Sequence, residues 1–345
     1  MSDSLFSIGF GIGTQNNSGQ WLEVYYAQPV LAPSAEFGRA ISEALGYSGG
    51  NTVIDLSIEQ LDALADALSK AGETAQAALV TAMSDSQKPL VATVLATDDA
   101  PASVPETYLK LHLLSHRLVK PHQINLTGMF GTLPNVAWTN KGAIDIAELP
   151  AAQLKARLAG ETLTVDCVDK FPKMTNYVVP TGVRIAHTAR VRLGAYIGEG
   201  TTIMHEGFVN FNAGTEGPGM IEGRISAGVM VGAGSDLGGS SSTMGTLSGG
   251  GNIVISVGKE CLLGANAGIG IPLGDRCTVE AGLYITAGAK VAMLDDNGQL
   301  VKQVKARELA GQSDLLFRRN SSNGAVECLT NKSAVELNEA LHVNN

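Results

Sequence analysis

The sequence predicts a mainly β protein built around a parallel β-helix, and two observations support this. Aliphatic or small residues recur at every sixth position over much of the second half of the chain. This period fits neither an α-helix nor an ordinary strand, but it is the repeat of a solenoid in which three hexads make one triangular coil. Glycine supplies 41 of 345 residues and aromatic residues only 5%, which suits tight corners better than a broad globular core.

The six-residue repeat falls into three runs. They are Val179, Ile185, Val191, Ile197, Ile203 and Val209; Ile225, Val231 and Leu237; and Ile255, Cys261, Ala267, Leu273, Val279, Ile285 and Val291. Leu237 and Ile255 lie eighteen residues apart, so we expect the register to survive the Gly/Ser-rich stretch between them. Val209 and Ile225 lie only sixteen apart, so we expect segment 213–222 to bulge out of the coil.

Residues 1–110 lack the repeat and are predicted to form an α-rich N-terminal domain of helical or mixed character. Ser57 and Gln60 have the spacing of a capping box at the start of a helix. A second helix is expected over 74–83, and a third over 108–119.

Three further parts follow along the chain. They are a connector at 111–175, the solenoid at 176–293 with loop excursions at 213–222 and 238–252, and a C-terminal extension at 294–345. In the extension we expect a strand over 301–308, a hairpin turn at Asn323-Gly324 and a last helix over 333–342. Such an end piece would cover the open edge of the last coil.

The composition restricts the partners of the protein. The formal net charge is −9 with Lys and Arg scattered, whereas general nucleic-acid binding requires a concentrated cationic face. No stretch approaches ~18 consecutive apolar residues, and no signal peptide is recognisable, so we expect no membrane span. The four cysteines show no spacing typical of a zinc site. These features predict a soluble, cytoplasmic protein.

One candidate site is the segment 214–224, which contains Glu222 and Arg224 just before the repeat resumes. A carboxylate there could take a proton from an amine nucleophile, and a guanidinium could bind an anionic substrate. The alternative is a solvated ion pair on a loop.

Two further features could bind anions. Backbone N–H groups of the Gly/Ser-dense stretch 234–252 could hold an anion or a developing oxyanion, or the stretch is only a flexible excursion. The late cationic residues Lys305, Arg307, Arg318 and Arg319 suit a phosphate clamp, or they only aid solubility. A weaker glycine cluster at 9–16 is interpreted as a turn.

His187 and His205 lie eighteen residues apart, so they are expected to stack on adjacent coils roughly 5 Å apart. Two stacked histidines would begin a zinc site of the β-helical carbonic anhydrase kind, but a catalytic zinc ion usually has three protein ligands. No third histidine falls in the solenoid.

Several longer stretches resemble one enzyme family. They are MHEGFVNFNAGTEGPGMIEGRISAGV (204–229), GSDLGG (234–239), GTLSGGGN (245–252), GANAGIGIPLGD (264–275), VEAGLYITAG (279–288) and LLFRRNSSNGAVE (315–327). These stretches resemble tetrahydrodipicolinate N-succinyltransferases of the longer actinobacterial and pseudomonad form. The resemblance implies a homotrimer of left-handed parallel β-helices with active sites between subunits. It also implies transfer of succinyl from succinyl-CoA, a co-substrate, to ring-opened tetrahydrodipicolinate in diaminopimelate and lysine biosynthesis.

The resemblance also assigns roles by matching motifs. Glu222 corresponds to the catalytic carboxylate, acting as general base or as acceptor of the acyl group in a mixed anhydride. The residues matched to succinyl-CoA binding are Arg224; Gly239, Ser242 and Gly245 at the acyl end; Ala265, Glu280, Ala281 and Gly288 along the CoA path; and Lys305, Arg318, Arg319, Asn320 and Ser321 at the far end.

One position departs from the family pattern. Actinobacterial members hold Mg²⁺ near the three-fold axis with an Asp and a Glu; Glu206 matches the Glu, but Ala189 stands at the Asp position. A ring of three Glu206 carboxylates could still bind a hard cation. Two other functions remain open: a related acyltransferase that uses acetyl-CoA, and a non-catalytic β-helical interaction protein.

Overall fold

The computed structural model describes residues 4–245 and 253–330 and contains two compact units. The first unit comprises Met1–Leu118 and Gln123–Pro172, and the second comprises Val119–His122 and Lys173–Asn345. Among the described residues, no helix is long and apolar enough to span a bilayer.

The first unit contains an antiparallel sheet that the sequence analysis missed. Its strands are β1 (Ser7–Gln15), β2 (Trp21–Tyr26), β3 (Val30–Leu31), β4 (Thr52–Leu56) and β5 (Leu90–Leu95), in the order β2-β1-β5-β4 with β3 beside β1. The interpretation of 9–16 as a turn was wrong, because these residues form most of β1. Gly9 and Gly11 point to one face and leave room for Tyr26, whose ring carbons would lie 2.6 and 2.7 Å from a Cβ at these positions.

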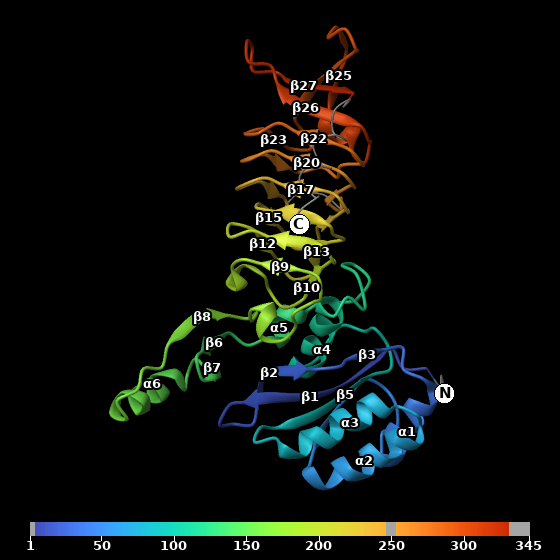
Figure 1. Cartoon of the computed structure of the whole chain (residues 1–345), viewed down its shortest axis with the longest axis vertical. Coiled ribbons are helices and arrows are strands. Elements are labelled where there is room, and N and C mark those ends of the chain that lie inside the picture. The colour runs from blue at the N-terminus through green and yellow to red at the C-terminus, as the bar shows by residue number, and fades with distance from the viewer. Residues whose placement is uncertain (1–3, 246–252, 331–345) are drawn as a thin grey trace. The chain divides into compact units, whose positions relative to one another are not determined.

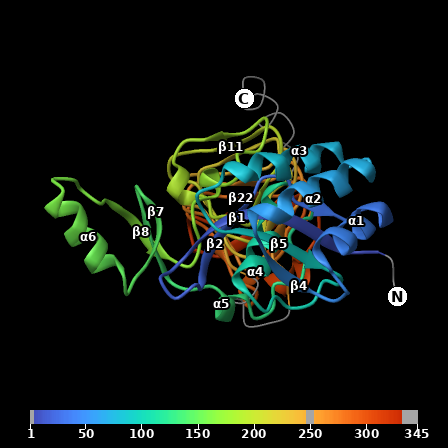
Figure 2. The ribbon, with the colours of Figure 1, turned by 90° about the horizontal axis from the view of Figure 1, so that it is seen from below.

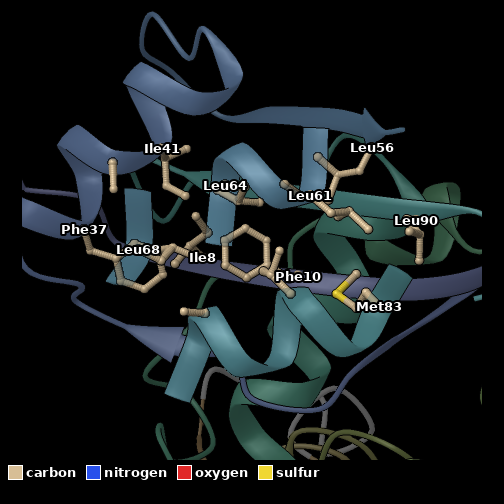
Figure 3. Close-up of a cluster of buried hydrophobic side chains, with 14 of the residues drawn as sticks. Ile8, Phe10, Phe37, Ile41, Leu56, Leu61, Leu64, Leu68, Met83 and Leu90 are labelled. Atoms are coloured by element: carbon tan, nitrogen blue, oxygen red, sulfur yellow. The ribbon is translucent and has the colours of Figure 1, made fainter. Parts of the chain in front are cut away.

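Helices cover both faces of this sheet (Figures 1 and 2). The helices α1 (Ala35–Leu45), α2 (Ile58–Lys70) and α3 (Thr74–Ala82) lie on one face, and α4 (Val104–Ser115) packs against β2 on the other. Because side chains alternate along a strand, Ile8 and Phe10 face α1–α3 and join their buried leucines (Figure 3). The α-rich domain therefore has a sheet at its centre.

Two of the expected helices begin where the sequence predicts, and the third begins earlier. Ser57 and Gln60 form the predicted capping box of α2, and α3 occupies 74–82 as expected within one residue. The helix expected over 108–119 instead runs over 104–115. It begins earlier because Ser103 accepts a hydrogen bond from the backbone N–H of Glu106 and because Pro105 fits the first turn.

The rest of the first unit is a small sheet with two helices. It comprises α5 (Met129–Thr132), β6 (Val136–Thr139), β7 (Gly142–Asp145), α6 (Leu149–Leu158) and β8 (Val165–Asp169), with the strand order β7-β6-β8. The short helix η1 (Met83–Asp85) follows α3, and its Met83 belongs to the core of the larger sheet. Figure 1 shows α6 at the end of this arm, and none of its residues is buried.

The second unit is the predicted parallel β-solenoid, with coils that stack one on another in Figure 1. The first sheet contains β10 (Ala195–Ile197), β13 (Ala213–Thr215), β16 (Met230–Val231) and β19 (Ser256–Val257). The second contains β9 (Arg184–Ile185), β11 (Thr201–Ile203), β14 (Gly219–Ile221), β17 (Asp236–Leu237), β20 (Leu262–Leu263) and β22 (Thr278–Val279). The third contains β12 (Phe208–Val209), β15 (Arg224–Ile225), β18 (Ser242–Thr243), β21 (Gly268–Ile269) and β23 (Tyr284–Ile285). Short turns η2 (Met174–Asn176) and η3 (Thr188–Arg190) precede the regular coils.

The expected bulge at 213–222 was wrong. Residues 213–215 and 219–221 form β13 and β14, which pair in register with β10 and β11 eighteen residues earlier. The spacing of sixteen instead of eighteen between Val209 and Ile225 arises at the corner that follows β14. Ile203 and Val209 are six residues apart, whereas their partners in the next coil, Ile221 and Ile225, are only four apart. The coil is therefore shortened at Glu222-Gly223.

The register assigned to the third run was also wrong in part. Leu237 pairs with Leu263, twenty-six residues later, and Ser242 remains within the coil as part of β18. The excursion thus begins after 243, not at 238. Ile255, Cys261 and Ala267 are buried, but they occupy the second inward position of each hexad, two residues before the strand positions. At the other end of the repeat, Val179 is 69% exposed and lies outside the core.

The C-terminal extension continues the second sheet. It contains β24 (Lys290–Leu294), β25 (Leu300–Lys305), η4 (Ala306–Leu309), β26 (Leu315–Arg319) and β27 (Val326–Thr330). β26 pairs in parallel with β22 and so covers the edge of the last coil, as expected. The hairpin between β26 and β27 turns at the predicted Asn323-Gly324, whereas the helix expected over 333–342 lies outside the described residues.

The buried histidine of α4 predicts a pH dependence of stability. His112 accepts the backbone N–H of Tyr26 at Nε2 and faces the carbonyl of Tyr108 with Nδ1, and burial lowers its pKa to about 3. The unfolded chain binds this proton below its ordinary pKa of 6.5. The first unit should therefore lose stability as pH falls below about 6.5, by at most ~1.4 kcal/mol per pH unit from this group. Urea denaturation at several pH values gives the free energy of unfolding as a function of pH. Below pH 6.5 this free energy should fall less steeply with decreasing pH in His112→Gln than in the unchanged protein. An equal pH dependence in the two proteins would contradict this.

Candidate active site

The register of the second sheet aligns most of the candidate residues in one column. Ile221, Leu237, Leu263, Val279 and Phe317 are successive parallel partners, and the first four are the last residues of their strands. The residues one or two positions after them therefore lie in line along the solenoid. We call Glu222, Gly239, Ala265, Ala281 and Arg319 the donor column. Four strand-to-strand steps separate β14 from β26, so at about 4.8 Å per step the column spans roughly 19 Å.

Glu222 occupies the shortened corner at one end of the donor column. Its backbone N–H and that of Gly223 both donate to the Leu237 carbonyl, at 2.8 and 3.1 Å. The carboxylate lies beside Gly239, since a Cβ on Gly239 would be 3.5 Å from Glu222 Oε2. Gly223 admits no side chain, because a Cβ there would lie 2.1 Å from Ser241 Oγ. The short corner thus fixes the backbone that carries the carboxylate.

Arg224 lies on the adjacent sheet, two residues after Glu222. Its exposed side chain donates from Nε to Oγ of Ser242, at 2.9 Å, and the two residues are parallel partners on β15 and β18. Ser242 is 5% exposed and therefore holds the guanidinium from a fixed position. Because Nε makes this bond, the two Nη nitrogens form the fork that can pair with a carboxylate.

The middle of the donor column carries only small side chains. Ala265 and Ala281 are both exposed, and Gly264 packs so closely on the next coil that a Cβ there would lie 2.5 Å from the Ala281 nitrogen. Glu280 borders this part, and its carboxylate accepts the backbone N–H of Arg319 at 2.6 Å. A long flexible ligand could therefore lie against the backbone between Gly239 and Arg319.

Glu327, which the sequence analysis missed, organises the far end. It is buried on β27, and its carboxylate accepts hydrogen bonds from Arg318 Nε at 3.0 Å and Asn320 Nδ2 at 2.7 Å. The bond from Asn320, followed by the Arg318 ion pair, lowers the pKa of Glu327. Arg318 is therefore already paired, whereas Arg319 donates from Nη1 to the Gly324 carbonyl. The Asn-Gly turn sets Arg318 opposite Glu327, so hairpin register could have identified this partner.

The remaining predicted residues lie outside the donor column. Gly288 and Lys305 are exposed around the next corner of the solenoid, after β23, and Ser321 is exposed in the hairpin turn. Gly245 is the last described residue before 253.

A metal centre finds little support in the residues described. His187 and His205 stack as predicted, with ring centroids 5.2 Å apart, but no group of three potential ligands occurs in the described part of the chain. The Glu206 side chain is 69% exposed, 3.6 Å from His205 Nδ1. With Ala189 at the position expected for an Asp, the donor set does not fit Mg²⁺, and we derive no step through a metal.

These features define a class of protein. In this solenoid a carboxylate that can accept a proton from an amine lies beside an arginine, and arginines that suit phosphates lie four steps away, an arrangement that fits a CoA-dependent acyltransferase. Three family models match parts of the chain: "Tetrahydrodipicolinate N-succinyltransferase N-terminal" at 56–131, "Tetrahydrodipicolinate N-succinyltransferase middle" at 133–173, and "Hexapeptide repeat of succinyl-transferase" at 254–287.

Full-length relatives identify the family. Proteins named 2,3,4,5-tetrahydropyridine-2,6-dicarboxylate N-succinyltransferase are 72% identical in Pseudomonas putida, over 100% of both chains, and 59% identical in Vibrio cholerae, over 99% of both. A crystal structure of a 2,3,4,5-tetrahydropyridine-2-carboxylate N-succinyltransferase from Campylobacter jejuni superimposes with a TM-score of 0.87 at 34% identity, covering 96% of this chain and 94% of that one. The chain belongs to the tetrahydrodipicolinate N-succinyltransferase family, as its motifs predicted.

The motif resemblance implies that the far end of the donor column binds CoA, and the Glu327 contacts then predict how a substitution there changes the donor KM. In Glu327→Gln, Arg318 loses its ion pair, and Asn320 keeps only a neutral partner. We expect the KM for the acyl-CoA donor to rise about three- to tenfold, because a charged hydrogen bond contributes roughly 1.5–3 kcal/mol and only part of it orients the hairpin. The kcat should change little. Asp314→Asn, which breaks the Arg276 ion pair at another corner, is the matched control and should leave this KM unchanged. Equal KM values for both variants and the unchanged protein would contradict the assignment.

Proposed function

We propose that this chain transfers the succinyl group of succinyl-CoA to the amino group of ring-opened tetrahydrodipicolinate. The products are N-succinyl-2-amino-6-oxopimelate and CoA, a step of diaminopimelate and lysine biosynthesis. The observation that supports this most strongly is the length of the donor column. An extended pantetheine arm needs on the order of 15–20 Å between the reacting thioester and the CoA phosphates, and the column provides roughly 19 Å between Glu222 and Arg319.

In the proposed mechanism the acceptor amine attacks the thioester carbonyl beside Glu222. The amine nitrogen forms the new amide bond, the C–S bond breaks, and the thiolate leaves as CoA. The Glu222 carboxylate accepts the proton that the amine loses, which then neutralises the thiolate. In the other route the Glu222 carboxylate attacks the thioester, the C–S bond breaks, and CoA leaves as the thiolate from a mixed anhydride. The amine then attacks the acyl carbon, the C–O bond breaks to return the Glu222 carboxylate, and the proton of the amine neutralises the thiolate.

Arg224 is proposed to select the acyl group. Its guanidinium, held by Ser242, would pair with the terminal carboxylate of a four-carbon acyl chain. Acetyl-CoA lacks this carboxylate and would leave the arginine unpaired in the closed site, which favours succinyl-CoA over the acetyl-CoA alternative.

We further propose that the molecule is a homotrimer of left-handed coils, with each donor column enclosed by a neighbouring subunit. In the single chain Arg224, Ala265 and Ala281 are exposed, so one wall of the site is open to solvent. Ligand sites usually bury most of the ligand surface, and a second copy of this chain would supply the missing wall. The exposed small residues would lie at that seam. The function of a non-catalytic interaction protein would not require these exposed residues to lie in line with the Glu222 carboxylate.

Glu222 provides the direct test of the mechanism. Release of CoA thiol from succinyl-CoA in the presence of tetrahydrodipicolinate should fall at least ~10²-fold in Glu222→Gln, because the amide can neither accept the proton nor the acyl group. Glu199→Gln, an exposed glutamate at another corner, is the matched control and should remain active. Near-normal turnover of a folded Glu222→Gln protein would show that another group performs this role. If the unchanged protein releases no CoA, the proposed function is wrong.

Arg224 provides a separate test of donor choice. Arg224→Met should lower kcat/KM for succinyl-CoA by about 10²-fold or more, since the acyl carboxylate loses its charged partner. The much lower value for acetyl-CoA should change by less than about threefold, because that donor makes no bond to the guanidinium. A parallel loss for both donors would indicate a general structural role for Arg224.

A further inference from the structure

Tyr284 is an exposed aromatic residue beside the candidate site, and the mechanism proposed above does not use it. It lies on the outer face of β23, and its side chain is 43% exposed. Parallel pairing places it in one line with the site residues of the third sheet: Arg224 pairs with Ser242, Ser242 with Gly268, and Gly268 with Tyr284. At about 4.8 Å per step, Tyr284 is roughly 14 Å from Arg224 along the solenoid, on the same side as the acyl-CoA path.

The ring is held close to Gly268. A Cβ on Gly268 would lie 2.2 Å from Cε2, 2.3 Å from Cδ2 and 2.7 Å from Cζ of Tyr284. One edge of the ring therefore occupies the space of the missing side chain and covers Gly268, which is buried although it lies on the outer face of β21. The ring leans from β23 across β21 toward Ser242, while its other parts remain open to solvent. Glycine at 268 is what permits this position.

The position of the ring matches a particular part of the donor. With carbon–carbon bonds of about 1.5 Å, a succinyl group is about as long as one strand-to-strand step. A donor whose acyl carboxylate is at Arg224 therefore has its sulfur and first pantetheine methylenes one to two steps further on, beside β18 and β21. These are the apolar atoms of the donor, and sulfur and methylene groups pack favourably on aromatic rings.

We propose that Tyr284 is a binding residue for the thioester sulfur and adjoining pantetheine chain of the acyl-CoA donor. The role of Gly268 in this proposal is to leave space for the ring of Tyr284. This inference rests on the proposed function and extends it. The ring provides an apolar wall between the polar acyl end, at Arg224 and Ser242, and the polar far end at Arg318 and Arg319. The hydroxyl group has no part in this role.

Steady-state kinetics with succinyl-CoA test the inference. Tyr284→Ala should raise the KM for succinyl-CoA about three- to tenfold, the range expected for loss of a sulfur–aromatic contact with some apolar burial, and change kcat less than about twofold. Tyr284→Phe should behave like the unchanged protein. Gly268→Ala should displace the ring and reproduce the effect of Tyr284→Ala, but it should add nothing in a protein that already carries Tyr284→Ala. Leu300→Ala, an exposed apolar residue on β25, is the control.

Three results would overturn the inference. The first is an unchanged donor KM in Tyr284→Ala while the unchanged protein is active, a result that leaves the proposed function intact. The second is a full additional effect of Gly268→Ala in the double variant, which would mean that Gly268 acts without the ring. The third is a change of oligomeric state in Tyr284→Ala, seen by sedimentation, which would place the ring against a second copy. If Gly268→Ala does not fold, the comparison of Tyr284→Ala with Tyr284→Phe decides.

Discussion

Parallel pairing between successive coils is the constraint on which the rest of the second unit depends. Each coil donates its backbone N–H groups to the next, and the inward aliphatic residues are almost fully buried in the shared core. Strand spacing is therefore fixed at about 4.8 Å, and only the corners can change in length. The corner at Glu222-Gly223 is two residues shorter than the one below it, and the corner after Thr243 is longer. The proposed proton transfer lies at the shortened corner of Glu222, while the regular coils keep their distances constant.

The same constraint explains how short strands can set a fixed distance between residues that contact the two ends of a long ligand. Globular enzymes bring distant residues together in a pocket, whereas this chain spreads them at equal steps along one corner. Glu222 and Arg319 are almost a hundred residues apart in sequence, but only four steps separate their strands. Glu327 then fixes the hairpin at the far end through Arg318 and Asn320. Fixed spacing and fixed ends suit a donor whose two functional ends lie far apart.

The periodicity was sufficient to predict the solenoid and the stacked histidines, and the Asn-Gly pair was sufficient to predict the hairpin, because these depend on local sequence. It was insufficient for the register beyond the Gly/Ser-rich loop. Both inward positions of a hexad accept small or aliphatic residues, so Ile255, Cys261 and Ala267 mimic the strand positions that Val257, Leu263 and Ile269 occupy. Likewise, the glycines of β1 resemble a turn in composition, and only the packing of Tyr26 upon them explains a strand. Glu222, Arg224 and the late cationic residues were singled out from the sequence itself, and the other site residues came from motif resemblance; only the register reveals that many of them lie in line. Glu327 was missed, although the hairpin register set by the Asn-Gly turn could have identified it. Tyr284 depends on its contact with Gly268 across strands, which no local motif shows.

A crystal structure of the assembled protein with succinyl-CoA, or with a non-reactive analogue of it, tests the central claim most directly. The measured quantity is the path of the pantetheine arm along the solenoid. We predict that the thioester lies beside Glu222 and Gly239, that the arm passes Ala265 and Ala281, and that the CoA phosphates reach the hairpin of Arg318 and Arg319. A bound donor whose thioester lies far from Glu222, or whose arm runs along a different corner, would contradict it.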